Sequence, residues 1–200
     1  MKRILVSFLL IFLVSFSFQV KSFAYSTDPE KFISEIVDQA KLILNSSASK
    51  EEKAEKLSVI ALETVDVKGI GYYTLGKKRK EINPDQLKKY EKLFQKYFLK
   101  SFTSRLTDYS DPKISVLSAE KVSDKYTIVK TMLVKTDKKP EVKIDWRVYT
   151  KDPNKPLIRD LIVEGLSLAR TQKEEFASIL STNDNDVNAL FKSLEEFIKK

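Results

Sequence analysis

The spacing of apolar residues changes at Asp111-Pro112, and this change constrains the fold more than any other feature of the chain. Over Phe32–Leu106 apolar residues recur at steps of three and four, the repeat of a helix with one buried face. Over Lys113–Glu164 the step is close to two, the repeat of a β-strand. The helical repeat returns over Phe176–Ile198. Helices, then strands, then helices predict an α+β fold with helices packed over one face of an antiparallel sheet.

Four positions in the first half carry residues that begin helices. Asp, Ser and Asn side chains accept hydrogen bonds from the free N–H groups of a first turn, and proline suits the first helical position. A Ser followed three residues later by Glu forms a capping box. These signals occur in order at Asp28-Pro29, Ser49 with Glu52, Asp66, and Asn83-Pro84. We therefore expect four helices here, the last and longest ending near Thr107.

The third of these helices should be short and tightly packed. It spans Val67 to about Leu75 and contains Gly69 and Gly71, each of which weakens a helix by about 1 kcal/mol relative to alanine. Two glycines so close together indicate that something bulky packs against the helix. Gly76 is the expected end, because glycine adopts the backbone conformation that ends helices.

The middle of the chain predicts four strands joined by short turns, which make neighbouring strands antiparallel. The expected strands are Ile114–Val122, Lys125–Thr136, Glu141–Thr150 and Leu157–Val163. The expected turns are Ser123-Asp124, Asp137–Pro140 and Asp152–Pro156. In the third strand Val142, Ile144, Trp146 and Val148 alternate with more polar residues, so the sheet should have one apolar face and one wetter face.

Two further helices are expected to close the chain. Thr171 and Glu174 have the spacing of a capping box ahead of Phe176. The last apolar face runs from Val187 to Ile198. The sequence shows no internal repeat and no break that would suggest a second domain.

The N-terminus has the three parts of a secretory signal peptide. Lys2 and Arg3 precede an apolar stretch of 15 residues, Ile4–Phe18, and Ser22-Phe23-Ala24 fits a cleavage site. The stretch is short for a membrane span of about 20 residues, although an uncleaved anchor is the alternative. We therefore expect a signal peptide over residues 1–24, cleavage near Ala24, and one exported domain over residues 25–200 in the periplasm. The chain has no cysteine, so it has no attachment site for a lipoprotein's lipid.

The chain has no histidine and no cysteine. Catalysis by a histidine base and zinc, copper or haem sites are therefore not expected, and neither a metal nor a cofactor is predicted. The full chain has a net charge of +8, and without Lys2, Arg3 and Lys21 of the expected signal peptide 33 basic and 28 acidic residues leave +5, a modest positive charge that favours contact with anionic membrane surfaces. Nucleic acid is not expected as a partner, since no aromatic and basic motif for it is present. These observations favour a binding protein over an enzyme, and we expect a monomer.

An aromatic stripe on the long helix suggests either a core face or one wall of a ligand cavity, and periodicity cannot distinguish a filled core from a hollow one. Other apolar residues on the glycine-containing helix and the strands could complete such a wall. The predicted wall residues are Tyr72, Leu75, Phe94, Phe98, Phe102, Met132, Ile144, Trp146, Val148 and Val163.

Two groups of charged residues have a functional and a structural interpretation. The carboxylates of Asp66, Asp145, Asp160 and Glu164 lie near apolar sequence, where a buried carboxylate could act as a base. A helix cap explains Asp66 better, and Asp145 could simply pair with Arg147. The basic run Lys77, Lys78, Arg79 and Lys80 is either a solvated loop or a contact for lipid headgroups or an acidic partner.

Several segments, in order along the chain, resemble the MlaC (toluene tolerance Ttg2D) family. Val65–Gly76 resembles its "Asp-x-x-x-small-x-x-x-Leu-Gly" helix, and Asn83–Phe98 resembles the next element. Arg159–Leu168 is similar to its most recognisable stretch, "Asp-x-x-Val-Glu-Gly-apolar-Ser-Leu". Lys173 stands where the family usually has arginine, and Leu157 where tryptophan is common, which leaves the contacts of those two positions open.

The resemblance implies a soluble periplasmic carrier of Gram-negative bacteria. Such a protein holds diacyl phospholipid in an apolar cavity of a fold shaped like nuclear transport factor 2. It would exchange the lipid with an outer-membrane lipoprotein–porin complex and an inner-membrane ABC transporter, and so maintain outer-membrane lipid asymmetry. Two alternatives remain open from the residues. One is an isomerase, or another binder of hydrophobic ligands, on the same pocketed fold. The other is a structural or chaperone-like protein with a solid core.

Overall fold

The protein is described by a computed structural model over residues 24–107, 113–134 and 140–200. The helices are α1 (Pro29–Leu44), α2 (Lys50–Thr64), α3 (Val67–Leu75), α4 (Pro84–Leu106), α5 (Leu168–Ser181) and α6 (Val187–Lys199), with a 3-10 helix η1 (Gly76–Lys80) after α3. The strands are β1 (Ile114–Ser123), β2 (Tyr126–Leu133), β3 (Val142–Tyr149), β4 (Leu157–Val163) and β5 (Leu166–Ser167). The α+β class predicted from the sequence is confirmed. The expected signal peptide and the turn over residues 137–140 fall outside the described residues, apart from Ala24 and Pro140.

The predicted caps place four helix starts correctly. Asp28 accepts the N–H of Lys31, and Asp66 accepts the N–H of Gly69, each at 2.9 Å. Ser49 and Asn83 each form a full capping box at the start of α2 and α4. Local hydrogen bonding therefore decides where these helices begin.

The predicted start of α5 is wrong. The helix begins at Leu168, three residues before Thr171, and its N-cap is Ser167, which accepts the N–H of Arg170 at 3.1 Å. Thr171 lies inside the first turn and donates its hydroxyl to the Ser167 carbonyl at 3.1 Å. The spacing of Thr171 and Glu174 therefore does not mark a capping box.

The sheet has five strands in the order β1-β2-β3-β4-β5, all antiparallel, rather than the four predicted. The extra strand is the two-residue β5, too short for an alternation of apolar and polar residues to reveal it. Val163 pairs with Leu166 around a tight turn in which Glu164 and Gly165 both have positive φ, 49° and 81°. Such turns suit the right-handed twist of antiparallel strands.

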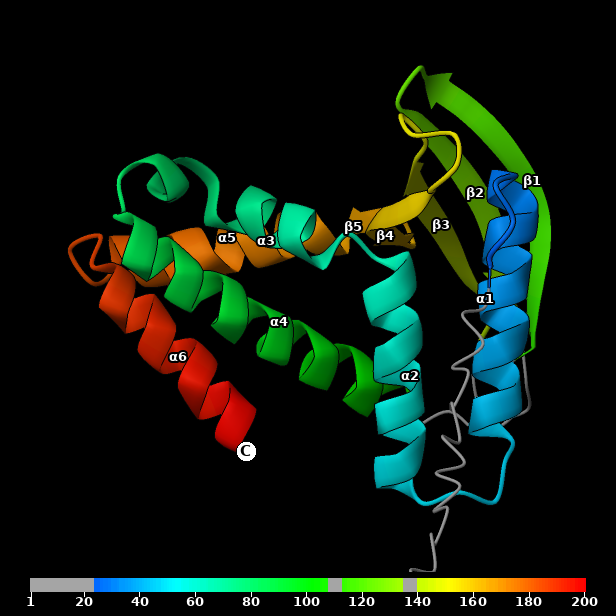
Figure 1. Cartoon of the computed structure of the whole chain (residues 1–200), viewed down its shortest axis with the longest axis horizontal. Helices are drawn as coiled ribbons and strands as arrows, with labels where there is room; N and C mark the ends of the chain where they lie inside the picture. Colours follow the sequence, from blue (N-terminus) through cyan, green and yellow to red (C-terminus); the bar gives the residue numbers. More distant parts are fainter. Residues whose placement is uncertain (1–23, 108–112, 135–139) are drawn as a thin grey trace, which may run out of the picture.

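One apolar cluster lies between α1 and the inner face of the sheet. Figure 1 shows α1 lying along β1 and β2, on the concave face of the curved sheet. The largest buried members are Phe32 and Ile33 from α1 with Val129 and Val148 from the sheet. This cluster gives the sheet the one apolar face that strand alternation predicts.

A second apolar cluster lies within the helices that follow α2. Its members come from α3, α4, α5 and α6, and include Tyr90, Phe94, Phe176 and Leu190. Aromatic rings meet across these helices, since Phe94 and Phe176 form an edge contact at 6.2 Å and Tyr97 and Phe197 lie 4.7 Å apart. The main neighbours of α4 are therefore α2, α3 and α6 rather than the sheet.

The two clusters meet at the junction between α2 and α3. Val65 contacts both clusters, and the adjacent Asp66 accepts a hydrogen bond from Arg159 Nε on β4 at 2.7 Å. The N–H of Asp66 also donates to the carbonyl of Ile158 at 2.9 Å. Arg159 covers the ring of Tyr149 at 3.5 Å. Polar contacts at the start of α3 thus join this helix to the sheet.

Candidate functional site

The inner face of β3 and β4 extends beyond the part that helices cover. The strand register pairs Trp146 with Val129 and Ile144 with Thr131, so these side chains share one face with the fully buried Val129. Val163 is opposite Ile144 on β4 and shares that face too. Yet Ile144, Trp146 and Val163 are only half-buried, whereas Val129 is fully buried. Part of an apolar sheet face therefore remains incompletely covered.

The polar atoms of this face are satisfied within the sheet. The indole N–H of Trp146 donates to Thr131 Oγ1 at 3.0 Å, and Thr131 donates to the carbonyl of Ile144 at 2.9 Å. Thr131 is only 1% exposed. Among the described residues no buried side-chain nitrogen or oxygen lacks a hydrogen-bond partner. The Trp146 ring can therefore present its apolar surface without leaving a donor unpaired.

The aromatic stripe of α4 divides into a core part and an open part. Phe94 is 2% exposed and belongs to the helical cluster. Phe98 and Phe102 are half-buried and stack on each other with parallel rings 5.9 Å apart. The C-terminal half of α4 thus carries apolar rings that the protein covers only in part.

The other predicted wall residues lie elsewhere. Leu75 and Val148 are fully buried, one in each cluster, where neighbouring side chains surround them. Met132 follows Thr131 on β2 and is opposite the exposed Lys143, so it points to the outer face of the sheet. Met132 therefore cannot share a wall with Trp146. Tyr72 lines a different cleft, which it shares with Phe94.

Two members of the inner face were not predicted from the sequence. Thr131 positions the Trp146 ring, and Leu161 is opposite Trp146 on β4. Alternation from Val129 along β2, and from Val163 along β4, could have placed both residues on this face. In the sequence, Thr131 looks like a polar residue that interrupts an apolar face. Its hydroxyl is satisfied by hydrogen bonds to a neighbouring strand, and the sequence of β2 alone does not show this.

The cleft beside Tyr72 has a volume of about 280 Å³ and lies between α2, α3, α4 and the start of β4. Its polar side chains satisfy one another: Glu91 accepts a short hydrogen bond from the Tyr72 hydroxyl and pairs with Lys68 at 3.2 Å. These contacts lower the pKa of Glu91, the Tyr72 hydrogen bond being the larger cause. The cleft is small, and apolar side chains such as Leu62, Val65 and Phe94 line it together with these polar ones.

The carboxylates considered as bases mostly hold the fold together. Asp66 caps α3 and pairs with Arg159, while Glu164 accepts the N–H of Lys143 at 2.5 Å beside its turn. Asp160 is 5% exposed and accepts hydrogen bonds from the Ser167 hydroxyl at 2.6 Å and the Ala169 N–H at 3.0 Å. Asp145 lies on the outer face, opposite Lys130. These carboxylates do not converge on a common point of the inner face.

The basic run forms η1 instead of an irregular loop. Lys78 pairs with Glu81 at 3.1 Å, and Arg79 lies over the ring of Tyr72 at 5.0 Å. Lys77 and Lys80 are exposed. Over the part of the chain that the structure describes, no group of acidic side chains could hold a metal ion. In the same part, no helix combines the length and apolar character needed to cross a membrane.

Comparison with known proteins identifies the family. The model of the family described as "MlaC protein" matches residues 34–196. The chain belongs to the MlaC protein family. The chain is also similar to a solved structure of a phospholipid-binding protein from Ralstonia solanacearum in complex with a phospholipid. That similarity covers 89% of this chain and 98% of the other, with 18% identity and a TM-score of 0.72, and it confirms the MlaC fold.

The stretch that most resembles the MlaC pattern has a structural explanation. Asp160 accepts a hydrogen bond from the N–H of Ala169 in the first turn of α5. Glu164 and Gly165 form the turn between β4 and β5, and Ser167 caps α5. A carboxylate near the first turn of a helix is favourably placed in the field of its dipole. The most recognisable residues of this MlaC chain thus join the sheet to α5.

Proposed function

We propose that this MlaC protein carries a phospholipid whose acyl chains bind to the incompletely covered apolar faces of β3, β4 and α4. One observation carries the proposal: two apolar surfaces in one molecule, one on the sheet and one on a helix, are left half-buried. Soluble proteins normally cover such surfaces unless a ligand or partner does so. The contact residues proposed are Phe98, Phe102, Ile144, Trp146, Leu161 and Val163. The similarity to a phospholipid-bound protein supports the choice of ligand.

The energetics of acyl chains explain why a carrier is needed. Burial of each methylene contributes about 0.8 kcal/mol, so two chains of about 15 methylenes each resist transfer into water by roughly 25 kcal/mol. A lipid therefore does not cross an aqueous gap at a useful rate alone. A carrier must offer apolar contact that nearly matches the contact in a membrane, so that a docking partner can favour either loading or release.

The place in transport that we propose follows family membership. The protein is exported to the periplasm, loses residues 1–24, and acts there as a monomer. It exchanges phospholipid with an outer-membrane lipoprotein–porin complex and an inner-membrane ABC transporter, which maintains outer-membrane lipid asymmetry. The signal-like N-terminus supports export.

A carrier role needs no chemical step, and the side chains around the inner face agree with that. The face is apolar, its indole N–H is already bonded, and the nearby Asp160 carboxylate is engaged by the start of α5. An isomerase would need a carboxylate directed at its substrate. We therefore favour binding and transport over catalysis.

The test is native mass spectrometry of the protein after expression in a Gram-negative host. The expected spectrum contains the polypeptide together with one diacyl phospholipid. Ile144→Asn places an amide on the inner face and should reduce the lipid-bound fraction, because an unpaired amide is costly against hydrocarbon. The matched control is Ile128→Asn, half-buried on the outer face of β2, which should retain lipid. A parent protein that is always empty, or two variants that lose lipid equally, would show the proposal to be wrong.

A further inference from the structure

Cationic side chains from two separate elements gather at the end of α3. Lys77, Arg79 and Lys80 come from η1, and Lys173 comes from α5. Lys173 lies against η1, since a Cβ built on Gly76 would be 3.5 Å from Lys173 Cε. Figure 1 shows η1 above α5 at the left end of the molecule. We call these four residues, together with Tyr73, the basic end.

The charge of the basic end is largely uncompensated. Lys78 is neutralised by Glu81, and Lys68 by Glu91. Among the residues that the structure describes, Lys77, Arg79, Lys80 and Lys173 form no salt bridge. Four like charges held near one another repel, so their placement costs stability unless an anionic surface balances them.

The basic end also presents an aromatic ring to solvent. Tyr73 is 45% exposed, and Lys173 Nζ lies over its ring at 4.9 Å. Arg79 covers the neighbouring Tyr72 at 5.0 Å, so the second tyrosine holds the guanidinium in place. Tyrosine rings beside lysine and arginine suit the boundary between lipid headgroups and water, where the ring meets the upper acyl region and the cations meet phosphates.

From this combination we infer that the basic end docks on the surface of a bilayer that contains anionic phospholipids. An acidic protein surface could also use the cations and the tyrosine, but a phospholipid carrier must approach membranes, so we take the bilayer as the partner and an acidic protein as the alternative outcome of the test. The inference rests on the proposed carrier function in one respect, that a carrier must approach membranes. The basic end is separate from the open apolar face, since none of its residues lies on β3, β4 or the C-terminal half of α4.

The experiment is flotation of the purified exported protein with vesicles. Intact mass first verifies that the N-terminus is Tyr25, because a retained signal segment would bind vesicles itself. One set of vesicles contains phosphatidylethanolamine and phosphatidylglycerol, and the other only phosphatidylcholine.

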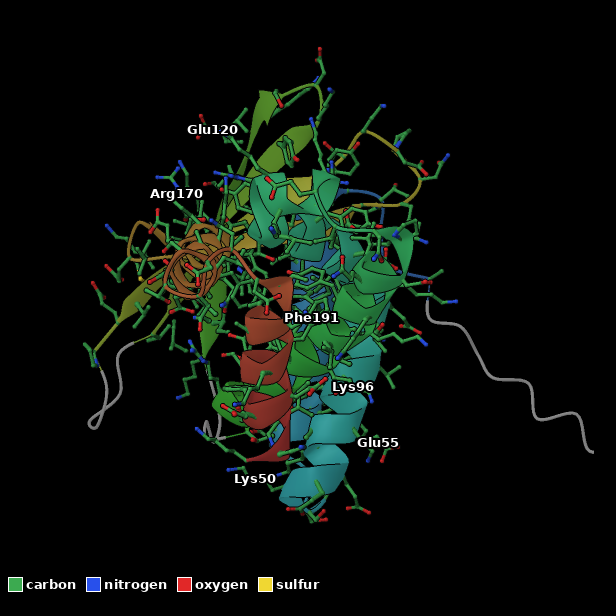
Figure 2. All side chains as sticks on the ribbon, turned by 90° about the vertical axis from the view of Figure 1, so that its left-hand side faces the viewer. Lys50, Glu55, Lys96, Glu120, Arg170 and Phe191 are labelled. Atoms are coloured by element: carbon green, nitrogen blue, oxygen red, sulfur yellow. The ribbon has the colours of Figure 1, made fainter. Side chains whose placement is uncertain are left out.

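The test variant combines Lys77→Gln, Lys80→Gln and Lys173→Gln. The control combines Lys56→Gln, Lys92→Gln and Lys96→Gln, exposed lysines of α2 and α4 with the same total charge change. Figure 2 shows Lys96 on α4 near α2, well below Arg170 on α5.

At low salt the parent should float with the anionic vesicles only. The test variant should bind them on the order of 100-fold more weakly, because each of the three lost cations contributes about a fivefold factor and the factors multiply. The control variant should bind like the parent. Tyr73→Ser should weaken binding without changing its salt dependence. A parent that does not bind anionic vesicles, or a control that loses as much binding as the test variant, overturns the inference; in the first case an acidic protein becomes the candidate partner. All variants should keep co-purified lipid, so an empty parent contradicts the carrier proposal and not this one.

Discussion

At the scale of single residues, Gly71 shows how closely α3 and α4 pack. A Cβ at this position would lie 2.8 Å from Phe94 Cδ1, closer than two carbon atoms approach without strain. Phe94 is buried among other rings and cannot turn away freely. The prediction that a bulky group packs against the glycines of α3 is confirmed for Gly71.

Gly71→Ala should therefore destabilise the protein. Overpacking a core costs about 1–3 kcal/mol, and the better helix propensity of alanine offsets at most about 1 kcal/mol of that loss. Urea unfolding followed by circular dichroism measures the difference. The control, Glu55→Ala on the exposed side of α2 (labelled in Figure 2), should change stability by less than about 0.5 kcal/mol. Equal midpoints for the parent and Gly71→Ala would contradict the close contact.

One half-buried tyrosine and one fully buried tyrosine make the folded state sensitive to alkali. Burial, with a smaller effect from Glu63, raises the pKa of Tyr25 to about 12. Burial likewise raises the pKa of Tyr90, whose hydroxyl bonds to Thr74 and to the carbonyl of Gly71. The unfolded chain releases these protons near pH 10. The stability that the neutral phenols contribute is thus complete below about pH 10 and is lost as the pH rises toward the folded values.

The free energy of unfolding should consequently be constant from about pH 8 to about pH 9.5 and fall above about pH 10. Urea titrations at several pH values measure it directly. Tyr25→Phe should reduce the alkaline slope, because one titrating group is removed. A slope that remains the same in this variant would show that Tyr25 ionises equally easily in both states.

At the scale of elements, the start of α5 depends on a residue from another element. Asp160 on β4 accepts the Ser167 hydroxyl and the Ala169 N–H and is almost fully buried. Asp160→Asn keeps the shape of the side chain but removes its negative charge. The NH₂ group of the new amide must then face either the Ser167 hydroxyl or the Ala169 N–H, both of which donate to Asp160. We expect a loss of about 2–3 kcal/mol, because hydrogen bonds to a charged group are strong and a buried donor left unpaired is costly.

The change is measured as a shift of the urea midpoint, with Asp124→Asn as the control. Asp124 is paired with Lys121 in a turn where its side chain is 98% exposed, so its substitution should change stability by at most about 1 kcal/mol. If the two variants unfold at the same midpoint, Asp160 does not anchor α5.

The same contact explains which helix starts could be predicted. The starts of α1, α2, α3 and α4 follow from capping residues next to the helix in sequence. The start of α5 also has a local N-cap, Ser167, but it is held in addition by Asp160 across a hairpin, and no local pattern contains that second contact. Periodicity likewise predicted the aromatic face of α4 but not its partners. The face of a helix is a property of its own sequence, whereas its neighbours depend on the whole fold.

At the scale of the whole molecule, two apolar clusters meet at Val65, and part of one sheet face and part of α4 remain only half-buried beside them. The sequence predicted several residues of this region, including Trp146 and Phe98, because alternation and helical spacing identify inward positions. It could not separate them from Leu75 and Val148, since the same patterns produce filled and unfilled interiors. Only the burial of each side chain in the folded protein separates the half-buried Trp146 and Phe98 from the fully buried Leu75 and Val148.

Phe94 and Phe98 test that distinction with one substitution at two positions. They lie one helical turn apart on α4 with stacked rings 6.3 Å apart, but Phe94 is fully buried and Phe98 is half-buried. Phe94→Ala should cost about 3–5 kcal/mol, as expected for a large ring removed from a packed core. Phe98→Ala should cost less than about 2 kcal/mol, because water already reaches part of its ring.

The lipid content should change in the opposite order. Phe98→Ala removes a surface proposed to hold acyl chains, so native mass spectrometry should show a smaller lipid-bound fraction than in the parent. Folded Phe94→Ala should retain lipid, since its ring serves the core. A solid-core protein would instead lose comparable stability at both positions and contain no lipid at all. Stability and lipid content measured on the same two variants therefore separate a carrier from a protein whose aromatic helix only stabilises the fold.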